Sequence, residues 1–402
     1  MNQNLRQQFP SLSRIYNKQP LVFLDGPAGT QVPNSVINAI SNYYKTSNSN
    51  LHGHFILTKE SDEMVAHTRE KVADFLGAAG GHTISFGQNM TTLNYSLSRA
   101  IASGFHPGDE VVITQLDHES NRAPWLALRE KGVIVREARL KNDGTLDYGD
   151  FAGKINDRTR LVAMGWASNI FGTINEIKKI RELTYDVGAL LLLDAVHFAP
   201  HLSIDVQAIG CDFLLCSAYK FYGPHVGLLY CKPGLLDRLQ PERLRTAYQH
   251  APYSIETGTL NHAAIAGVGA AIDFIADLGQ GKSYRARLTD AMHNIHQHEK
   301  HLARTLYNGI RSMPQYQIYG PDIEATQRAP TLSFMHQQAT ANQVGKYLGK
   351  YNICSWSGHF YAIKSTEVLG LLEKGGVTRL GISAYNNIND IHHTLEILAQ
   401  LK

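Results

Sequence analysis

A lysine that follows a run of apolar residues is the most chemically suggestive feature of this sequence. In the segment 211–232, CDFLLCSAYKFYGPHVGLLYCK, an expected strand ends near Ser217 and places Tyr219 and Lys220 in a turn. A lysine that is partly removed from water has a lowered pKa, and its amine becomes a nucleophile towards carbonyl groups. Because lysines at strand ends are often ordinary surface residues, Lys220 needs a second residue to support a chemical role.

Asp194 supplies that second residue. It ends another apolar run, LLLLD, at residues 190–194. A carboxylate at the end of a buried strand either caps a turn or needs a cation or hydrogen-bond donors nearby. The protonated nitrogen of a pyridine ring is such a cation. Lys220 and Asp194 therefore have the types of the Schiff-base lysine and the pyridinium partner that pyridoxal 5'-phosphate (PLP) requires.

Strands and helices alternate through the part of the chain that carries both residues. Short apolar runs predict strands at 110–114, 133–137, 160–167, 189–195, 213–218 and 227–231, and helical periodicity predicts helices at 91–103, 121–131 and 175–187. Several of the runs are apolar on both faces, as helices on both sides of a sheet require. We therefore expect an α/β fold with a mostly parallel central sheet, whose ligand lies at the carboxyl ends of the strands.

The pattern changes towards the C-terminus. Helices are expected at 261–278 and 282–313, followed by strands at 316–319, 331–335 and 377–383 and helices at 341–350 and 388–401. We interpret residues 21–284 as a PLP-binding large domain. Residues 1–20 and 285–402 would form a smaller, mainly C-terminal α+β domain.

Composition excludes several classes of protein. The 402 residues include 38 Lys+Arg and 35 Asp+Glu, a balance that argues against a nucleic-acid binder. The first residues lack the apolar segment of a signal peptide, and no run of 18 apolar residues predicts a membrane span. The four cysteines (Cys211, Cys216, Cys231, Cys354) form no CxxC pair, so we expect reduced thiols in a cytoplasmic protein and no metal site.

Beyond these two residues, a series of segments resembles the motifs of one enzyme family. They are FLDGPAGT (23–30), FLGA (75–78), DHESNRAPW (117–125), WASNIFGT (166–173), DAVHFAPH (194–201), SAYKFYGP (217–224), GTLN (258–261), WSGHFYA (356–362) and RLGISAYN (379–386). In this order they resemble the class V aminotransferase group of fold-type I PLP-dependent enzymes, and within it the cysteine desulfurases. The resemblance runs from Phe23 to the last helix. It implies PLP as cofactor, an amino acid as substrate and a homodimer with a shared active site.

The resemblance also assigns roles to the matched residues. Lys220 would form the Schiff base, Asp194 would hold the pyridine nitrogen protonated, and His118 would stack on the ring and relay protons. These three are the expected catalytic residues. The expected cofactor-binding residues are Asn89, Met90, Thr91, His118, Asn169, Asp194, His197, Ser217, Tyr219, Lys220 and Thr259, with the phosphate at a helix N-terminus and Thr259 reaching it from the partner chain.

Substrate recognition is expected to centre on Arg379. The resemblance implies that its guanidinium grips the α-carboxylate of the substrate as a bidentate fork. Asn169, Ala28 and His359 are the other expected substrate-binding residues.

Departures from the family pattern bear on the reaction. Tyr219 and His197 stand where the family has a histidine and a glutamine, and both can still donate a hydrogen bond. Tyr361 stands where cysteine desulfurases carry the cysteine that accepts sulfur as a persulfide, and Trp356 replaces an arginine of the same segment. Cys354 lies seven residues before Tyr361, and Cys211 and Cys216 are expected in the core.

A lost acceptor thiol leaves the cofactor chemistry possible. We expect a PLP-dependent lyase or transferase that cleaves the Cβ–S bond of an amino acid by β-elimination without a persulfide cysteine. The alternatives are a class V aminotransferase, an epimerase, a specialised biosynthetic enzyme, or a true cysteine desulfurase that uses Cys354. A protein that has lost turnover and serves as a sulfur-transfer or assembly partner is a further alternative, against which the presence of Lys220, Asp194 and His118 argues.

Overall fold

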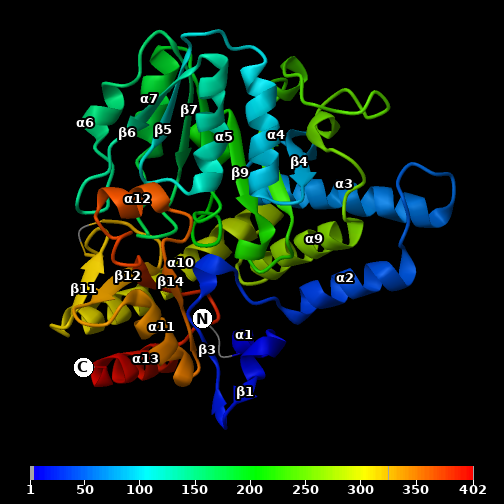
Figure 1. The fold of residues 1–402 in the computed structure, drawn as a ribbon. Helices are drawn as coiled ribbons and strands as arrows, with labels where there is room; N and C mark the ends of the chain where they lie inside the picture. The colour runs from blue at the N-terminus through cyan, green and yellow to red at the C-terminus, as the bar shows by residue number, and fades with distance from the viewer. Residues whose placement is uncertain (1–3, 325, 402) are drawn as a thin grey trace.

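A seven-stranded sheet forms the centre of the larger part of the molecule (Figure 1). The computed structural model describes residues 4–324 and 326–401. In the strand order β4-β10-β9-β8-β7-β5-β6, the neighbours from β9 to β6 pair parallel, and β10 pairs antiparallel with β9 and with β4. The strands are β4 (Ile84–Gly87), β5 (Glu110–Thr114), β6 (Ile134–Ala138), β7 (Thr159–Gly165), β8 (Leu190–Asp194), β9 (Phe213–Ser217) and β10 (Gly227–Cys231).

Both faces of this sheet are buried. Successive residues of β8 enter different cores: Leu191 and Leu193 pack into one apolar cluster, and Leu192 packs into the other. Because side chains alternate along a strand, an all-leucine run fits a sheet that is covered on both sides. The associated helices are α2 (Asn34–Thr46), α3 (Ile56–Leu76), α4 (Met90–Ala102), α5 (Ala123–Leu126), α6 (Tyr148–Ala152), α7 (Ile177–Asp186), α8 (Val206–Ile209) and α9 (His262–Ala276). The expected α/β fold is confirmed.

A second, four-stranded sheet lies in the C-terminal part of the chain. Its order is β11-β12-β15-β14, and all neighbours pair antiparallel. The elements are β11 (Tyr316–Tyr319), β12 (Thr331–His336), β14 (Trp356–Gly358), β15 (Val377–Gly381), α10 (Tyr284–Arg311), α11 (Ala341–Lys350), α12 (Ile363–Val368) and α13 (Ile388–Gln400). Leu332, Phe334 and Leu380 of this sheet share a core with Val344 of α11 and Leu398 of α13.

The N-terminal segment packs against this C-terminal part. It contains α1 (Asn4–Gln7), β1 (Ile15–Tyr16), β2 (Gln19–Pro20) and β3 (Val22–Phe23). Arg6 donates a 2.7 Å hydrogen bond to the Tyr385 carbonyl, and β3 pairs parallel with β13 (Ile353–Cys354). A division of the chain between residues 284 and 285 stays a prediction.

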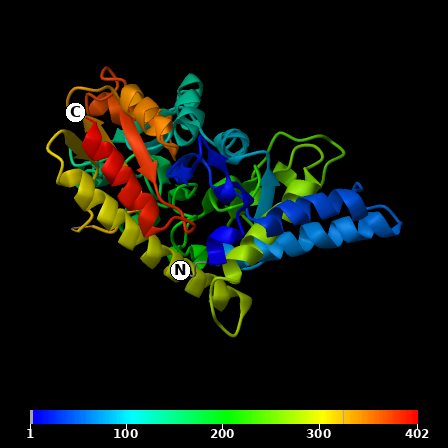
Figure 2. The ribbon, with the colours of Figure 1, turned by 90° about the horizontal axis from the view of Figure 1, so that it is seen from below.

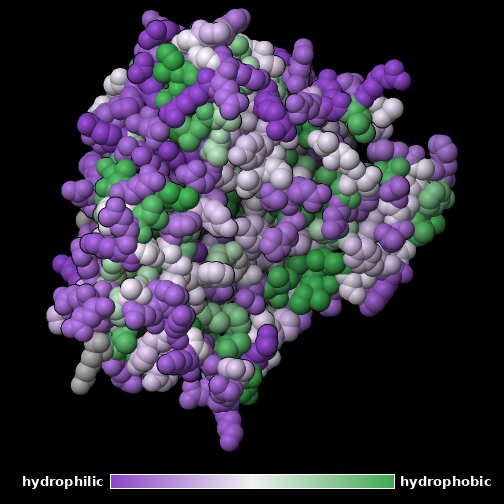
Figure 3. Space-filling view, viewed as in Figure 1, coloured by the Kyte–Doolittle hydropathy of each residue, from purple (hydrophilic) through white to green (hydrophobic). Residues whose placement is uncertain are grey.

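Helices α2 and α3 project from the body of the molecule (Figure 2). Both contact α9. Apolar side chains gather on the surface beside α2 (Figure 3), and Ile37, Tyr44, Phe55 and Ile56 are exposed large apolar residues of these two helices and the chain between them. Across the described ranges, no helix combines the length and the apolar character that a bilayer span requires.

Candidate active site

A cavity of about 610 Å³ lies at the carboxyl ends of β5, β7, β8 and β9. Residues that follow each of these strands line it, together with residues of the C-terminal part. Carboxyl ends of parallel strands are where α/β sheets bind ligands. Of the residues expected in the site, the cavity is lined by Ala28, Asn89, Met90, Thr91, His118, Asn169, Asp194, His197, Ser217, Tyr219, Lys220 and Arg379.

Lys220 and Asp194 are both buried on the wall of this cavity. Lys220 lies in the 3-10 turn 218–220 that follows β9, and its Nζ donates a hydrogen bond to the carbonyl of Pro27. Burial and the charge of Arg379 lower the pKa of Lys220 to about 7. Asp194 ends β8 and accepts a 2.9 Å hydrogen bond from the N–H of Val196, while burial raises its pKa to about 6.

His118 is held with a defined ring orientation. Its Nδ1 accepts a 3.0 Å hydrogen bond from the backbone N–H of Ser120 and lies 2.8 Å from the Ser120 hydroxyl. Burial, helped by the charges of Lys220 and Arg379, lowers the pKa of His118 to about 4, so the imidazole is neutral at pH 7. Since Nδ1 is the acceptor, the proton of the neutral ring lies on Nε2.

Sequence reasoning missed the neighbouring Asp117. It is buried, lines the cavity and accepts a 2.7 Å hydrogen bond from the N–H of Gly165. Burial raises the pKa of Asp117 to about 7, and the charge of Asp194 acts in the same direction. The signal that identified Asp194, a carboxylate just beyond an apolar strand, was present here too.

The N-terminus of α4 forms the wall that could hold a phosphate. The Asn89 side chain caps this helix by accepting a 2.9 Å hydrogen bond from the N–H of Thr92, and the N–H of Met90 donates to Ser217 Oγ at 3.0 Å. A Cβ added to Gly227 would lie 2.4 Å from the backbone carbon of Asn89. The glycine at the start of β10 therefore lets the loop close against the sheet, and backbone N–H groups at such a terminus favour an anion.

Arg379, Asn169 and Phe360 form a third part of the wall. Arg379 Nη1 donates a 2.8 Å hydrogen bond to the Asn169 carbonyl, and the Phe360 ring centre lies 4.0 Å from the guanidinium carbon. Burial lowers the pKa of Arg379 to about 9, which leaves it protonated at pH 7. Asn169 Nδ2 donates to the Phe360 carbonyl at 2.9 Å, whereas its buried Oδ1 has no hydrogen-bond partner among the described residues.

His197 and Tyr219, which replace a glutamine and a histidine of the family pattern, both lie on the cavity wall. His197 Nε2 lies 2.9 Å from Thr331 Oγ1, and the ring of Tyr219 stacks on His225 at 4.5 Å between centroids. Thr259 is exposed and does not line the cavity in this chain, and His359 also lies outside the lining. Their roles in cofactor and substrate binding stay predictions.

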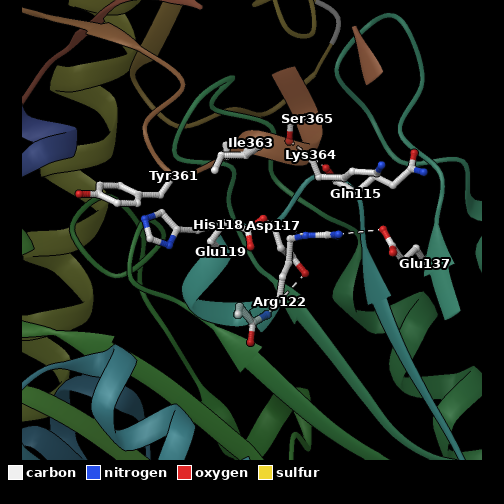
Figure 4. A network of polar contacts seen from close by, with 12 residues as sticks. Gln115, Asp117, His118, Glu119, Arg122, Glu137, Tyr361, Ile363, Lys364 and Ser365 are labelled. Carbon is white, nitrogen blue, oxygen red and sulfur yellow. Dashed lines mark hydrogen bonds and ion pairs between the residues drawn. The ribbon is translucent and has the colours of Figure 1, made fainter. Parts of the chain in front are cut away.

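The segment that carries Tyr361 reaches the cavity from the C-terminal part. The side chains of Tyr361 and His118 lie next to each other (Figure 4), and their ring centroids are 5.3 Å apart. Cys354, in β13, is half-buried outside the cavity lining, and burial together with Asp25 raises the pKa of its thiol to about 11. Cys211 and Cys216 are buried in the core, as expected, and Cys231 is buried as well.

An ion-pair network supports the turn that contains His118 (Figure 4). Arg122 is buried and pairs with Glu137 at 2.8 Å and with Glu119 at 3.3 Å. Ser365 Oγ of α12 donates a 2.9 Å hydrogen bond to the Gln115 carbonyl, which fixes α12 to the same turn. The His118 turn is therefore anchored on the sheet and also holds the C-terminal part.

Comparison with known proteins identifies the family. Residues 22–393 match the family model described as Aminotransferase class-V. The chain belongs to the class V aminotransferase family. The residues described above fit its cofactor, PLP, because the cavity combines a buried lysine, a buried carboxylate and a helix N-terminus. The chain is therefore a PLP-dependent enzyme of this family.

Curated relatives of the whole chain are named cysteine desulfurase. One from Yersinia pseudotuberculosis serotype O:1b (strain IP 31758) is 31% identical over 416 residues, covering 100% of this chain and 98% of the relative. One from Serratia proteamaculans (strain 568) is 30% identical with the same coverage. These names fit the alternative of a true cysteine desulfurase better than a persulfide-free lyase.

Solved structures of cysteine desulfurases share the fold. The apo structure of the enzyme from Thermococcus onnurineus NA1 has a TM-score of 0.88 at 24% identity and covers 100% of this chain and 98% of its own. The S-sulfonic acid form of CsdA from Escherichia coli has a TM-score of 0.86 at 24% identity, with coverage of 99% and 98%. At this identity the likeness establishes the fold.

Proposed function

We propose that this enzyme uses PLP to cleave the Cβ–S bond of a cysteine-derived amino acid by β-elimination, without passing the sulfur to one of its own cysteines. The observation that carries the proposal is the position of Tyr361. It lines the cavity at the motif position of the sulfur-accepting cysteine, and a phenol cannot form a persulfide. Cys354 lies outside the cavity lining, with a thiol whose pKa is raised to about 11.

The chain's own residues divide into a cofactor set and a substrate set. Lys220 would hold the aldehyde carbon of PLP, Asp194 its pyridine nitrogen, and Ser217 with the start of α4 its phosphate. Bound PLP would supply an electron sink for negative charge at the substrate α-carbon. Arg379 would bind the substrate α-carboxylate, because it is a buried, protonated guanidinium on the same cavity wall.

Proton transfer would fall to Lys220 and His118. With a pKa of about 7, the Lys220 amine is partly unprotonated at neutral pH and can accept the substrate α-proton. The Cα–H and Cβ–S bonds then break, a Cα–Cβ double bond forms, and the sulfur leaves as a thiolate that takes up a proton. Hydrolysis of the remaining fragment gives pyruvate and ammonia. The neutral His118, with its proton on Nε2, can relay protons near the substrate.

A direct assay tests the reaction. The enzyme is incubated with L-cystine or with an S-substituted L-cysteine, without an added thiol acceptor, and pyruvate is measured; the Lys220→Ala variant serves as the control. Stoichiometric pyruvate and ammonia support elimination. A keto acid that forms only when a second amino acceptor is supplied would instead support an aminotransferase.

A true cysteine desulfurase is the second candidate, favoured by the names of the full-length relatives. It would need the Cys354 thiol to reach the substrate. The backbone of Cys354 is held in the β3–β13 pair, where its carbonyl accepts a 3.1 Å hydrogen bond from the N–H of Leu24. Comparison of Cys354→Ser with the unchanged enzyme separates the two candidates. Sulfur release that is lost in Cys354→Ser would establish the desulfurase, and unchanged release would support elimination.

We also propose that the active site is shared within a homodimer. The exposed apolar residues of α2 and α3 and the exposed Thr259 support this arrangement. Coexpression of Lys220→Ala chains with Thr259→Glu chains tests the sharing. If each site combines Lys220 of one chain with Thr259 of the other, a mixed dimer contains one intact site and regains activity. Activity that does not exceed that of the two separate variants would contradict sharing, as would a fully active Thr259→Glu protein.

A further inference from the structure

Aromatic side chains surround the cavity on the side of Tyr361. Tyr95, Trp356, Phe360 and Tyr361 all line it. Although they line a cavity, Trp356 is 52% exposed, Tyr361 is 65% exposed and Tyr95 is 37% exposed. Exposed aromatic residues that converge on one concave site are typical of a surface that binds an apolar group.

The backbone of this segment is held in an unusual conformation. Phe360 has φ of 50° and Tyr361 has φ of 59°, in the left-handed region that residues with a side chain rarely occupy. Hydrogen bonds from Asn169 Nδ2 to the Phe360 carbonyl and from the Glu119 N–H to the Tyr361 carbonyl hold both residues, at 2.9 and 2.8 Å. Strained residues that are held in this way concentrate at ligand-binding sites.

This backbone gives the two rings separate positions. Phe360 lies against the guanidinium of Arg379, and Tyr361 lies against the ring of His118. If the α-carboxylate of a substrate binds Arg379 and its α-carbon lies at Lys220, the amino-acid part of the substrate occupies the buried wall of the cavity. The substituent on its sulfur must then extend along the remaining lining, where Trp356 and Tyr361 are exposed.

We propose that Trp356 and Tyr361 determine specificity for the sulfur substituent, and that the preferred substrate is a cysteine S-conjugate with an aromatic or extended apolar group. This inference rests on the proposed function, because it assumes that a cysteine derivative enters the site. Glu119 also lines the cavity, and its carboxylate is paired with Arg122. Because Arg122 already pairs with Glu119, the lining offers, among the described residues, no free charge partner to a second amino-acid end such as that of cystine, which would lose hydration against the aromatic residues. A neutral ring would pack on them without that cost.

The first experiment compares turnover. Pyruvate release is followed for S-benzyl-L-cysteine, S-methyl-L-cysteine and L-cystine in the holoenzyme. We expect kcat/KM to favour the benzyl conjugate by about tenfold or more, from ring packing and apolar burial. Trp356→Ala and Tyr361→Ala should lose this preference, Tyr361→Phe should keep it, and Tyr185→Ala, which removes a tyrosine that is 74% exposed on α7, should leave it unchanged. Equal kcat/KM for the three compounds, or a preference that survives both alanine variants, would overturn the inference.

The second experiment measures binding without turnover. 2-Amino-5-phenyl-L-pentanoate and L-norvaline are the sulfur-free analogues of the benzyl and methyl conjugates, and both lack a leaving group. Calorimetry on the holoenzyme should give tighter binding of the phenyl compound, by about tenfold, and Trp356→Ala should abolish the difference. Equal affinities would overturn the inference. Tighter binding of the phenyl compound without pyruvate from any conjugate would support the aromatic subsite and refute the proposed elimination.

Discussion

The backbone N–H of Glu119 donates a 2.8 Å hydrogen bond to the carbonyl of Tyr361, across the junction between the large sheet and the C-terminal part. Glu119 directly follows His118, so one turn orients the imidazole and also holds the aromatic segment. Arg122 anchors this turn by its contacts with Glu119 and Glu137. The wall proposed to bind the cofactor and the wall proposed to select the substituent are therefore joined through this one turn.

Lys220→Ala should abolish covalent attachment of PLP. Lys220 is the buried lysine on the cavity wall, and its lowered pKa suits an amine that condenses with an aldehyde. Borohydride reduction followed by mass spectrometry should place a pyridoxyl phosphate adduct on Lys220 of the unchanged protein and none on the variant. Lys232→Ala, which removes a half-exposed lysine just after β10, is the matched control and should retain the adduct. An adduct on a different lysine in the unchanged protein would contradict the assignment.

Arg379→Lys should raise KM for amino-acid substrates by about 10-fold to 100-fold, because a lysine keeps the charge but loses the bidentate hydrogen bonds. Steady-state kinetics with the α-carboxylate substrate and with its α-carboxamide separate binding from misfolding. The unchanged enzyme should prefer the carboxylate, and the variant should discriminate far less. If both proteins show the same ratio between the two compounds, Arg379 does not contact the α-carboxylate.

PLP-free protein should become more stable between pH 7 and pH 10 because of Lys220. Its pKa is about 7 in the folded state and about 10.4 in an unfolded chain, so the unfolded state binds more protons in this window. Stability therefore rises with pH there, by up to about 1.4 kcal/mol per pH unit from this group. Below pH 7 the amine is charged in both states and the full cost of burying that charge remains.

Urea unfolding of PLP-free protein at pH 7, 8, 9 and 10 measures this effect. Other groups also change the stability in this range. The buried cysteines, for example, have a folded-state pKa of about 12 and would ionise there only in the unfolded chain. The quantity of interest is therefore the difference between the unchanged protein and Lys220→Met. Lys220→Met should be more stable at pH 7, and its advantage should shrink towards pH 10. An advantage that is constant with pH would mean that the lysine does not titrate near 7.

The large sheet could be read from the sequence because its strands have an unambiguous signal. The expected strands 110–114 and 227–231 coincide with β5 and β10, and the expected strand 213–218 differs from β9 by one residue. Runs that are apolar on both faces and bounded by turns leave little choice of element. The order of the motifs along the chain indicated the family, and the family model confirms it. The same motifs contain most of the residues that line the cavity.

Shorter elements carried weaker signals. β4 has four residues, and β14, WSG, lacks the β-branched residues typical of strands, so neither was predicted. The expected helix 121–131 is instead split into α5 (Ala123–Leu126) and a 3-10 segment at 127–131. Tertiary contacts decide such cases. The left-handed backbone of Phe360 and Tyr361 is one example, because it depends on hydrogen bonds from Asn169 and Glu119, which are far away in the sequence.

Gly227→Ala should weaken PLP binding more than it weakens the fold. The added Cβ would lie 2.4 Å from the backbone carbon of Asn89, so the N-terminus of α4 must shift away from Ser217. A displaced helix terminus no longer presents its N–H groups to the phosphate, and the dissociation constant of PLP should rise about 10-fold or more. Gly349→Ala is the matched control, because a Cβ added there, within α11, meets nothing within 4 Å. Equilibrium dialysis gives the PLP affinity and urea unfolding of the PLP-free proteins gives stability; a variant that loses stability but keeps its PLP affinity would show that α4 does not bind the phosphate.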